Sequence, residues 1–394
     1  MPEYLAPGVY VEETSFRAKS IEGVGTSTTG FVGPTRKGPI GGLPELLTSF
    51  GDFERLYGGL DNLGFGLNYL AHAVRAYFDN GGARLYVARV GGAGAAAAAS
   101  ALVVNGGAAA DNARFVARTV GAAGNGTVLA RLMAAPVTPA TLGNTAQGSL
   151  LRADGPTLAV RRGIAWEDEA GDPVDPAGLA NTEILTLAVT LTDASSAAIQ
   201  LDDLGFDSAH PRWVGHVLAV NPVRRIDQLQ NLIALESGAN ITGFELFAAL
   251  FTAGPELSIP LTGGSDGAMP GAAAYQTALN ELARLEDIAI VAAPGCSAAP
   301  EVDFATIQQA LITHAEARRA YRIAVLDTPP DLEISGARAV RGQIDSKYAA
   351  LYYPWVVVAN PLAQPGRDDI PKEITLPPSG FVCEIGRASC RERV

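Results

Sequence analysis

Residues 288–327, IAIVAAPGCSAAPEVDFATIQQALITHAEARRAYRIAVLD, decide the fold class, because strand and helix patterns alternate within them. The apolar runs 288–293 and 322–327 have the length and composition of buried strands, and residues 304–319 between them have the pattern of a helix. A helix that joins two buried strands implies a right-handed crossover and parallel pairing. We therefore expect an α/β fold, whose core is a mixed, largely parallel sheet with flanking helices.

The same alternation continues on both sides of this stretch. Upstream, residues 272–286 predict a helix, and residues 67–78 predict another that ends at a pair of glycines before the strand-like run 84–90. Downstream, residues 352–358 predict a final strand, in which Pro354 indicates a sheet edge or a bulge. The core is therefore expected to be assembled from two separate parts of the chain.

The pattern changes between residues 91 and 216. A Gly/Ala-rich segment leads into short β-type runs such as 157–160 and 184–189, which are separated by acidic turns rich in Gly and Pro. We expect an inserted, peripheral β-rich domain here. The first twenty residues are expected to form an arm, because the β-type run Val9-Tyr10-Val11-Glu12-Glu13 needs a partner elsewhere in the fold or on another chain.

These patterns divide the chain into six expected segments. They are an N-terminal linker arm (1–20), the first part of the α/β core (21–90), the inserted β-rich domain (91–216), the second part of the core (217–365), the start of a truncated C-terminal domain (366–384) and a non-native tail (385–394).

The composition is that of a folded, acidic protein. Hydrophobic residues make up 48% of the 394 residues, which suffices for a sizeable core, and the formal net charge is −12. This charge disfavours nucleic-acid binding, which requires Lys and Arg to neutralise phosphates. No apolar run approaches the ~20 residues of a membrane helix, and the N-terminus lacks the features of a secretory signal. We expect no nucleic acid, no membrane insertion and a cytoplasmic site of assembly.

The cysteines and histidines show no metal-ligand spacing. They are Cys296, Cys383, Cys390, His72, His210, His216 and His314. His314 and Glu316 are two apart on a predicted helix and so face different sides. The carboxylates Asp202 and Asp203 are expected in a solvent-facing acidic loop. We expect no metal and no cofactor.

Two glycine clusters, residues 121–126 and 263–267, invite a nucleotide-binding interpretation. Neither matches G-x-G-x-x-G between a strand and a helix, and Lys37 lies in a loop without the glycines of a phosphate-binding loop. Turns that need positive φ explain both clusters better. Ser265 lies outside any G-x-S-x-G motif and is expected in a turn or at a helix N-cap. No catalytic residue is predicted, and an α/β enzyme with a ligand site in a Gly-rich loop is the alternative function.

An aromatic cluster surrounds the last predicted strand. It contains Tyr348, Tyr352, Tyr353 and Trp355. Core packing and a subunit interface both account for it, and the sequence leaves the two open.

Seven different short sequence blocks are distributed along the chain between residues 7 and 355. They are Pro7–Glu13, Gly30–Pro39, Thr48–Phe53, Phe78–Val87, Leu261–Gly267, Arg322–Asp327 and Ala349–Trp355. In this order they resemble the contractile tail sheath proteins of phages and related injection systems. Each block alone is weak, but seven in the family's order form a specific pattern.

The resemblance implies a structural subunit and no enzyme. It implies six-membered rings stacked helically around an inner tube, with N- and C-terminal arms that donate strands to neighbouring sheets. Contraction would repack the subunits while the arms keep them tethered. The implied intersubunit arm is Val9–Glu13.

The resemblance also implies partners and a location. The partners are further copies of the chain, the inner tail tube protein, and baseplate and terminator proteins. The location is a virion tail or an injection-system sheath, assembled in the bacterial cytoplasm. A phage tail, a bacteriocin and an extracellular injection system all stay open.

The chain departs from this family at its end. Residues 377–382 match the start of the family's C-terminal domain, but the expected glycine and strand do not follow Cys383 or Glu384. Residues 385–394 resemble an in-frame translation of a sequencing adapter. We expect these residues, with Cys390, to be non-native and the natural gene to continue.

Overall fold

A six-stranded sheet forms the centre of one half of the molecule, in the order β17-β16-β15-β1-β3-β2. The structure is a computed structural model that describes residues 28–154, 157–195, 198–298, 304–317 and 320–383. All neighbouring strands are parallel except β2 and β3. The strands are β1 (Thr28–Pro34), β2 (Leu46–Leu47), β3 (Leu85–Val90), β15 (Ile288–Ala292), β16 (Ile323–Asp327) and β17 (Ala349–Tyr352).

Helices cover both faces of this sheet. They are α1 (Phe50–Tyr57), α2 (Tyr69–Asp79), α7 (Ala272–Leu282), α8 (Phe304–Glu316), α9 (Ile334–Gly342) and α10 (Ser379–Val382). Successive strand residues enter different cores: Phe31 and Val87 pack with α1 and α2, whereas Val32 and Ala88 pack with α7 and α8. Burial on both faces explains the near-continuous apolar strands of the sequence.

Antiparallel sheets form the other half. The larger one has the order β10-β9-β8-β7-β11-β6-β14, with β12 also paired to β11, and the smaller has the order β13-β5-β4. The strands are β4 (Val104–Asn105), β5 (Asn112–Ala117), β6 (Thr127–Pro136), β7 (Leu150–Ala153), β8 (Thr157–Arg162), β9 (Ala165–Glu167), β10 (Pro173–Val174), β11 (Glu183–Thr192), β12 (Ala198–Leu204), β13 (Ile233–Ser237) and β14 (Glu256–Pro260).

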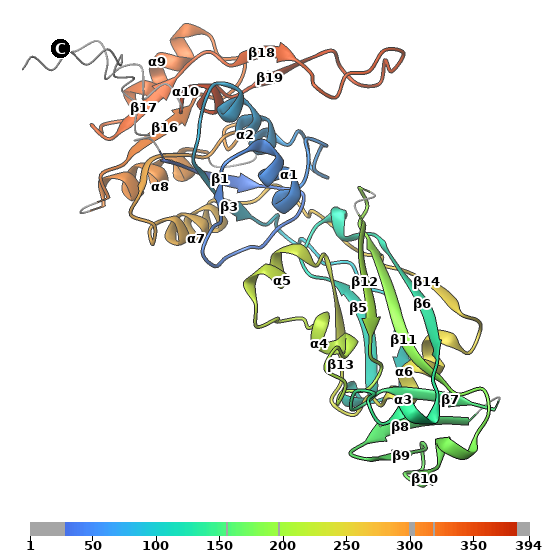
Figure 1. Cartoon of the computed structure of the whole chain (residues 1–394). Helices are drawn as coiled ribbons and strands as arrows, with labels where there is room; N and C mark the ends of the chain where they lie inside the picture. The colour runs from blue at the N-terminus through green and yellow to red at the C-terminus, as the bar shows by residue number, and fades with distance from the viewer. Residues whose placement is uncertain (1–27, 155–156, 196–197, 299–303, 318–319, 384–394) are drawn as a thin grey trace, which may run out of the picture.

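Four short helices accompany these strands: α3 (Pro139–Leu142), α4 (Val214–Val217), α5 (Arg225–Gln230) and α6 (Gly243–Phe251). Figure 1 shows that the blue and orange-red parts of the chain lie together in the α/β half, while the green and yellow middle forms the antiparallel half. The expected fold class is confirmed: a largely parallel sheet with flanking helices, together with a β-rich part. The expected arm with Val9–Glu13 and the tail 385–394 lie outside the described residues.

Residues 217–260 lie in the antiparallel half, although the sequence pattern led us to expect them in the core segment 217–365. β13 pairs with β5, β14 pairs with β6, and side chains such as Leu246 of α6 share one core with both sheets. The order of helices and strands resembles that of the α/β core, but local patterns do not encode which sheet a strand joins.

Three local expectations also differ from the structure. The run 352–358 is not one strand: β17 ends at Tyr352, and β18 (Val356–Ala359) pairs with β19 (Glu373–Leu376) in a separate hairpin. Pro354, which has no N–H to donate, lies between the two strands. The helix expected to end at residue 286 ends at Leu282. Asp202 and Asp203 are exposed, as expected, but lie on β12 and not in a loop.

Candidate functional site

The carboxyl end of the parallel sheet is where open α/β folds bind ligands, and here α10 lies against it. The backbone N–H of Ser379 donates to Asp327 Oδ1 (2.8 Å), and its hydroxyl donates to Oδ2 (2.6 Å). Gly380 lets α10 approach α2 closely, because a Cβ there would lie 2.6 Å from Ala73 Cα. Burial raises the pKa of Asp327 to about 7, although the two hydrogen bonds from Ser379 oppose this. The chain itself therefore occupies this ligand position beside β16.

Cys296 and Cys383 are both fully buried near this position. Burial raises the pKa of each thiol above its usual range, and the charge of Asp327 adds to the effect. Nucleophilic cysteines need a lowered pKa and access to solvent. Neither residue therefore has the character of a nucleophile, and Cys390 lies outside the described residues.

The histidines that the sequence singled out have separate structural environments. Burial lowers the pKa of His72, on α2, to about 4. His314 Nε2 lies 2.5 Å from the Arg322 guanidinium, and burial lowers its pKa to about 4. His210 Nδ1 accepts from the backbone of Arg212 (3.1 Å), and His216 is exposed.

Within the described residues, no three or more His, Cys, Asp or Glu side chains gather as a metal site would require. In the same part of the chain, no helix has the length and apolar character needed to cross a membrane. Glu316 accepts a hydrogen bond from Ser346 Oγ (2.6 Å).

The aromatic cluster divides into a half-buried and an exposed part. Trp355 Nε1 donates to Thr328 O (2.6 Å), and its ring meets that of Tyr69 edge to face at 5.5 Å between centroids. The three tyrosines of the cluster remain 37–41% exposed. Core packing therefore accounts for the tryptophan but not for the tyrosines.

The two halves are joined by a two-stranded backbone ribbon, residues 93–99 and 262–268. Ala93 and Ala268 exchange N–H···O bonds of 3.0 and 2.9 Å, and Ala99 and Thr262 exchange bonds of 2.9 and 3.0 Å. The Gly/Ala-rich segment of the sequence thus pairs, side by side, with the segment by which the chain returns to the α/β half. The two segments by which the chain passes between the halves are therefore held together by main-chain hydrogen bonds, which do not depend on side-chain identity.

Both glycine clusters of the sequence meet at this ribbon. Gly264 N donates to Asn125 Oδ1 (2.8 Å), and Asn125 Nδ2 donates back to Gly264 O (2.9 Å). A Cβ on Gly264 would lie only 2.7 Å from Gly121 O. Gly121 itself has φ 131°, a conformation that favours glycine. The clusters therefore serve close backbone packing and leave no open phosphate cradle between them.

Asp266 connects the two halves through one carboxylate. Its Oδ2 accepts from Gly64 N of the α/β half (2.9 Å), and its Oδ1 accepts from Ala122 N of the antiparallel half (2.8 Å). Ser265, next to it, accepts from Gly267 N (3.1 Å) and so lies in a turn, one of the two positions expected for it.

Arg89, on β3, makes a second connection. Its guanidinium donates to Gly38 O (2.6 Å) in the α/β half and to Val120 O (2.7 Å) in the antiparallel half. Burial lowers the pKa of Arg89 to about 10, and nearby Asp266 opposes the shift. The guanidinium remains charged near neutral pH, which strengthens its hydrogen bonds to carbonyls.

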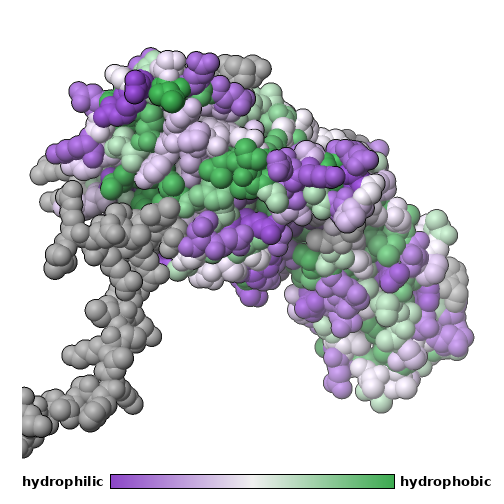
Figure 2. Space-filling view, turned by 90° about the horizontal axis from the view of Figure 1, so that it is seen from above, coloured by the Kyte–Doolittle hydropathy of each residue, from purple (hydrophilic) through white to green (hydrophobic). Residues whose placement is uncertain are grey.

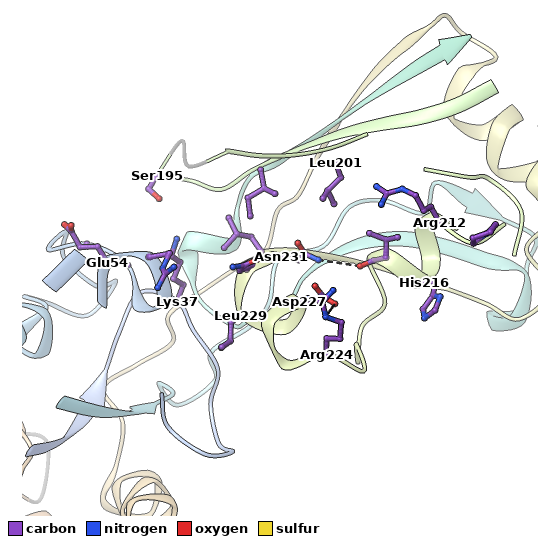
Figure 3. Close-up of a pocket in the computed structure, with 18 residues that line it drawn as sticks. Lys37, Glu54, Ser195, Leu201, Arg212, His216, Arg224, Asp227, Leu229 and Asn231 are labelled. Carbon is purple, nitrogen blue, oxygen red and sulfur yellow. Dashed lines mark hydrogen bonds and ion pairs between the residues drawn. The ribbon is translucent and has the colours of Figure 1, made fainter. Parts of the chain in front are cut away.

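The ribbon, Asp266 and Arg89 together form the connection between the two halves, which we name the joint. A cleft of about 940 Å³ lies beside it. Figure 3 shows Lys37 and Glu54 on the α/β side and Leu229 and Asn231 on the other. Lys37 Nζ bonds to Asp193 Oδ2 (3.2 Å), with side chains only 12% and 3% exposed.

A further ion pair closes the joint at a separate place: Arg225 of α5 contacts both Glu45 and Leu43 O of the α/β half. The lysine that the sequence placed in a loop, Lys37, thus holds a carboxylate of this chain. The whole arrangement is suited to holding two bodies in a fixed orientation.

The sequence analysis missed Asp266, Arg89 and Asp193 as joint residues. Arg89 carried a signal, since it is a charged residue in an otherwise apolar strand that is buried on both faces. Asp266 lies in the block Leu261–Gly267, but its residue type and position gave no reason to single it out from its neighbours. Asp193 carried no local signal.

Comparisons with known proteins give a distant likeness. No protein-family model matches the sequence, and no curated protein matches it. A solved structure of a sheath tail protein from Listeria innocua shares 12% sequence identity, with a TM-score of 0.41, over 92% of this chain and 56% of that chain. The chain therefore spans a little over half the length of that protein.

Proposed function

We propose that this chain is a structural subunit of a contractile tail sheath. It polymerises as stacked hexameric rings around an inner tube and contracts to drive that tube through a target envelope. The observation that carries the proposal is the ordered set of family-like blocks, six of which fall within the described residues.

The positions of these blocks support a role in the framework of the subunit. Gly30–Pro39 contains most of β1, Arg322–Asp327 contains β16, and Leu261–Gly267 forms one side of the ribbon. The antiparallel half contains none of the blocks between its first and last strands. The blocks thus mark the α/β half as the part that resembles the sheath proteins, and the antiparallel half as an insertion into it.

The candidate site favours this proposal over an enzyme with a Gly-rich ligand loop. Both glycine clusters pack against backbone at the ribbon, and α10 lies at the carboxyl end of β16. The charged side chains of the joint are matched to partners of this same chain, as in Lys37–Asp193. These features suit force transmission between two bodies and offer no arrangement for a reaction.

The proposed partners are further copies of the chain, the inner tube protein, and baseplate and terminator proteins. Residues 9–13 are the proposed tether between neighbouring copies, through strand addition. We place the end of the insertion at the ribbon, residues 262–268, because the strands before it pair within the antiparallel half. The proposed location is a virion tail or an injection-system sheath.

Electron microscopy of the natural full-length protein, alone and with a tube protein, tests the proposal. We expect ordered tubes of sheath diameter, and we expect removal of residues 1–20 to abolish them while circular dichroism of the subunit is unchanged. A small soluble oligomer that forms no tubes with the tube protein would show the proposal to be wrong.

A further inference from the structure

Most of the exposed large hydrophobic side chains of the described residues gather at two opposite edges of the six-stranded sheet. One group, which we name the leucine edge, lies at and beside β2 and consists of Ile40, Leu43, Leu46, Val220, Val223 and Ile226. The other, the tyrosine edge, lies around β17 and consists of Tyr321, Ile323, Ile334, Tyr348, Tyr352 and Tyr353. In Figure 2, hydrophobic residues reach the surface of the α/β half in several patches. Concentrations of this kind mark interaction surfaces.

The leucine edge combines side chains from two distant segments of the chain, which Arg225 holds together. Arg225 binds Leu43 O and Glu45, and this fixes the loop before α5 against the loop before β2. Ile40 and Gln228 line the same small cavity between these loops. Val223, two residues before α5, is 96% exposed. Its side chain therefore contributes to no core of the subunit.

The tyrosine edge lies on the last strand of the sheet at the other side. β17 pairs with β16 alone among the described strands, and the backbone of Ala324 donates to Tyr348 O (2.8 Å), which places Ile323 beside Tyr348. Tyr321 is 86% exposed and has φ 51°. A non-glycine residue in this conformation costs free energy, and such residues cluster at functional positions. Tyrosine is also enriched among the residues that dominate binding energy at interfaces.

We propose that the leucine edge of one copy binds the tyrosine edge of the next copy. This inference rests on the proposed function and names the surfaces through which subunits meet. The two edges lie at opposite ends of one sheet, so they meet only between copies. A contact between two different surfaces of identical chains is heterologous and produces a ring or a helical array. That is the symmetry a ring-forming sheath subunit requires.

The size of the edges fits this partner. Six side chains of this kind, each about half exposed, present on the order of 300 Å² of apolar surface. One partner in a standard interface contributes about 800 Å², of which a little more than half is non-polar. Each edge thus supplies about two-thirds of the apolar surface that one partner in such a contact contributes, and apolar atoms of the surrounding surface residues supply the rest.

Polar substitutions at single exposed positions test the pairing. Val223→Asp disables the leucine edge, and Tyr321→Asn disables the tyrosine edge while asparagine tolerates the positive φ. Ile164→Asp is the matched control, because Ile164 is 99% exposed and belongs to neither edge. Association of the purified chains is measured by sedimentation velocity over a concentration series, and folding is checked by circular dichroism.

The expected pattern is specific to a heterologous contact. Val223→Asp and Tyr321→Asn each weaken association at least tenfold, whereas Ile164→Asp matches the wild type. An equimolar mixture of the two disabled chains forms dimers that grow no further, because one intact leucine edge meets one intact tyrosine edge. Association of either disabled chain at the wild-type level, or a mixture that stays monomeric, overturns the inference.

The same variants separate this inference from the proposed function. If the wild type forms tubes and both disabled chains form them equally well, the pairing is wrong and the function stands. If the wild type forms no tubes with the tube protein, the function is wrong. The mixture of the Val223→Asp and Tyr321→Asn chains then still tests the contact between the two edges. A dimer in this mixture supports the contact, and the absence of a dimer overturns it.

Discussion

Asp327 holds Ser379 through both of its carboxylate oxygens, at 2.8 Å from the backbone N–H and 2.6 Å from the hydroxyl. This pair ties the end of β16 to α10, 52 residues further along the chain. Asp327 is 3% exposed and forms no ion pair with any described residue. A buried carboxyl without a cation favours its neutral form, which is why its pKa rises to about 7.

The first prediction concerns the pH dependence of folding. The pKa of Asp327 rises from 3.8 to about 7 on folding, so the folded chain retains a proton that the unfolded chain releases. The contribution of Asp327 to the free energy of unfolding is therefore complete below about pH 4 and is lost as the pH rises to about 7. The loss is about 4 kcal/mol. We expect Asp327→Asn to remove this pH dependence, because an amide does not titrate and still keeps two contacts to Ser379.

The measurement is urea unfolding of both proteins across this pH range. His72 and His314 have lowered pKa values and titrate with the opposite sign, so only the difference between variant and wild type isolates Asp327. Asp202→Asn, at an exposed position, is the control for the same change of residue type with the buried carboxyl left in place. A difference between Asp327→Asn and wild type that is independent of pH would contradict the assignment.

The second prediction concerns Asp266. Asp266→Ala removes the acceptor of two backbone N–H groups, those of Gly64 and Ala122. We expect a loss of about 1–3 kcal/mol, because Ala122 is partly shielded from water and its donor is left unpaired. Hydrogen exchange read at the amides of Gly64 and Ala122 should accelerate together. Asp202→Ala is the matched control, and unchanged exchange at both amides would refute the bridging role.

Sequence patterns were sufficient for the α/β core because periodicity is a local property. Phe31 and Val32 already alternate between two apolar faces, and each face has a helix of matching length nearby in the chain. The contacts of the joint, in contrast, are long-range and cannot be read from local sequence patterns. Asp266 binds backbone atoms 144 and 202 residues away, and backbone acceptors and donors leave no mark in the sequence.

The position of β13 and β14 was missed for a related reason. Both strands follow or precede a helix, as core strands do, so their local pattern matches that of the α/β half. Their partners, β5 and β6, lie about 120 residues earlier in the chain. The apolar pattern of a strand indicates which of its residues are buried but not which strand it pairs with. Assignment to a sheet therefore depends on long-range contacts that a single sequence does not show.

The third prediction concerns close packing at the ribbon. Gly264→Ala places a Cβ 2.7 Å from Gly121 O and 3.0 Å from Asn125 Oδ1, and neither atom has room to move without breaking the joint. We expect a destabilisation of about 1–3 kcal/mol, seen as a lowered Tm. Gly143→Ala is the control, because Gly143 has φ −61° and no atom within 4 Å of the added carbon. Equal Tm values for the two variants would contradict the close approach.

The fourth prediction concerns the ion pair at the cleft. Lys37→Met removes the cation 3.2 Å from Asp193, a side chain that is only 3% exposed. Loss of one partner from a buried pair costs about 3–5 kcal/mol, since the remaining charge stays out of water. Hydrogen bonds from the backbone N–H and hydroxyl of Ser195 to Asp193 persist, so we expect a value near the lower limit.

A double-mutant cycle gives this prediction its control. Adding Asp193→Asn to Lys37→Met removes the stranded charge and should recover most of the lost stability, as measured by urea unfolding. Arg75→Met breaks an exposed pair with Asp79, whose side chains are 41% and 66% exposed, and should cost well under 1 kcal/mol. If Lys37→Met costs no more than Arg75→Met, the Lys37–Asp193 pair does not hold the two halves together. The joint then depends on the ribbon, Asp266 and Arg89.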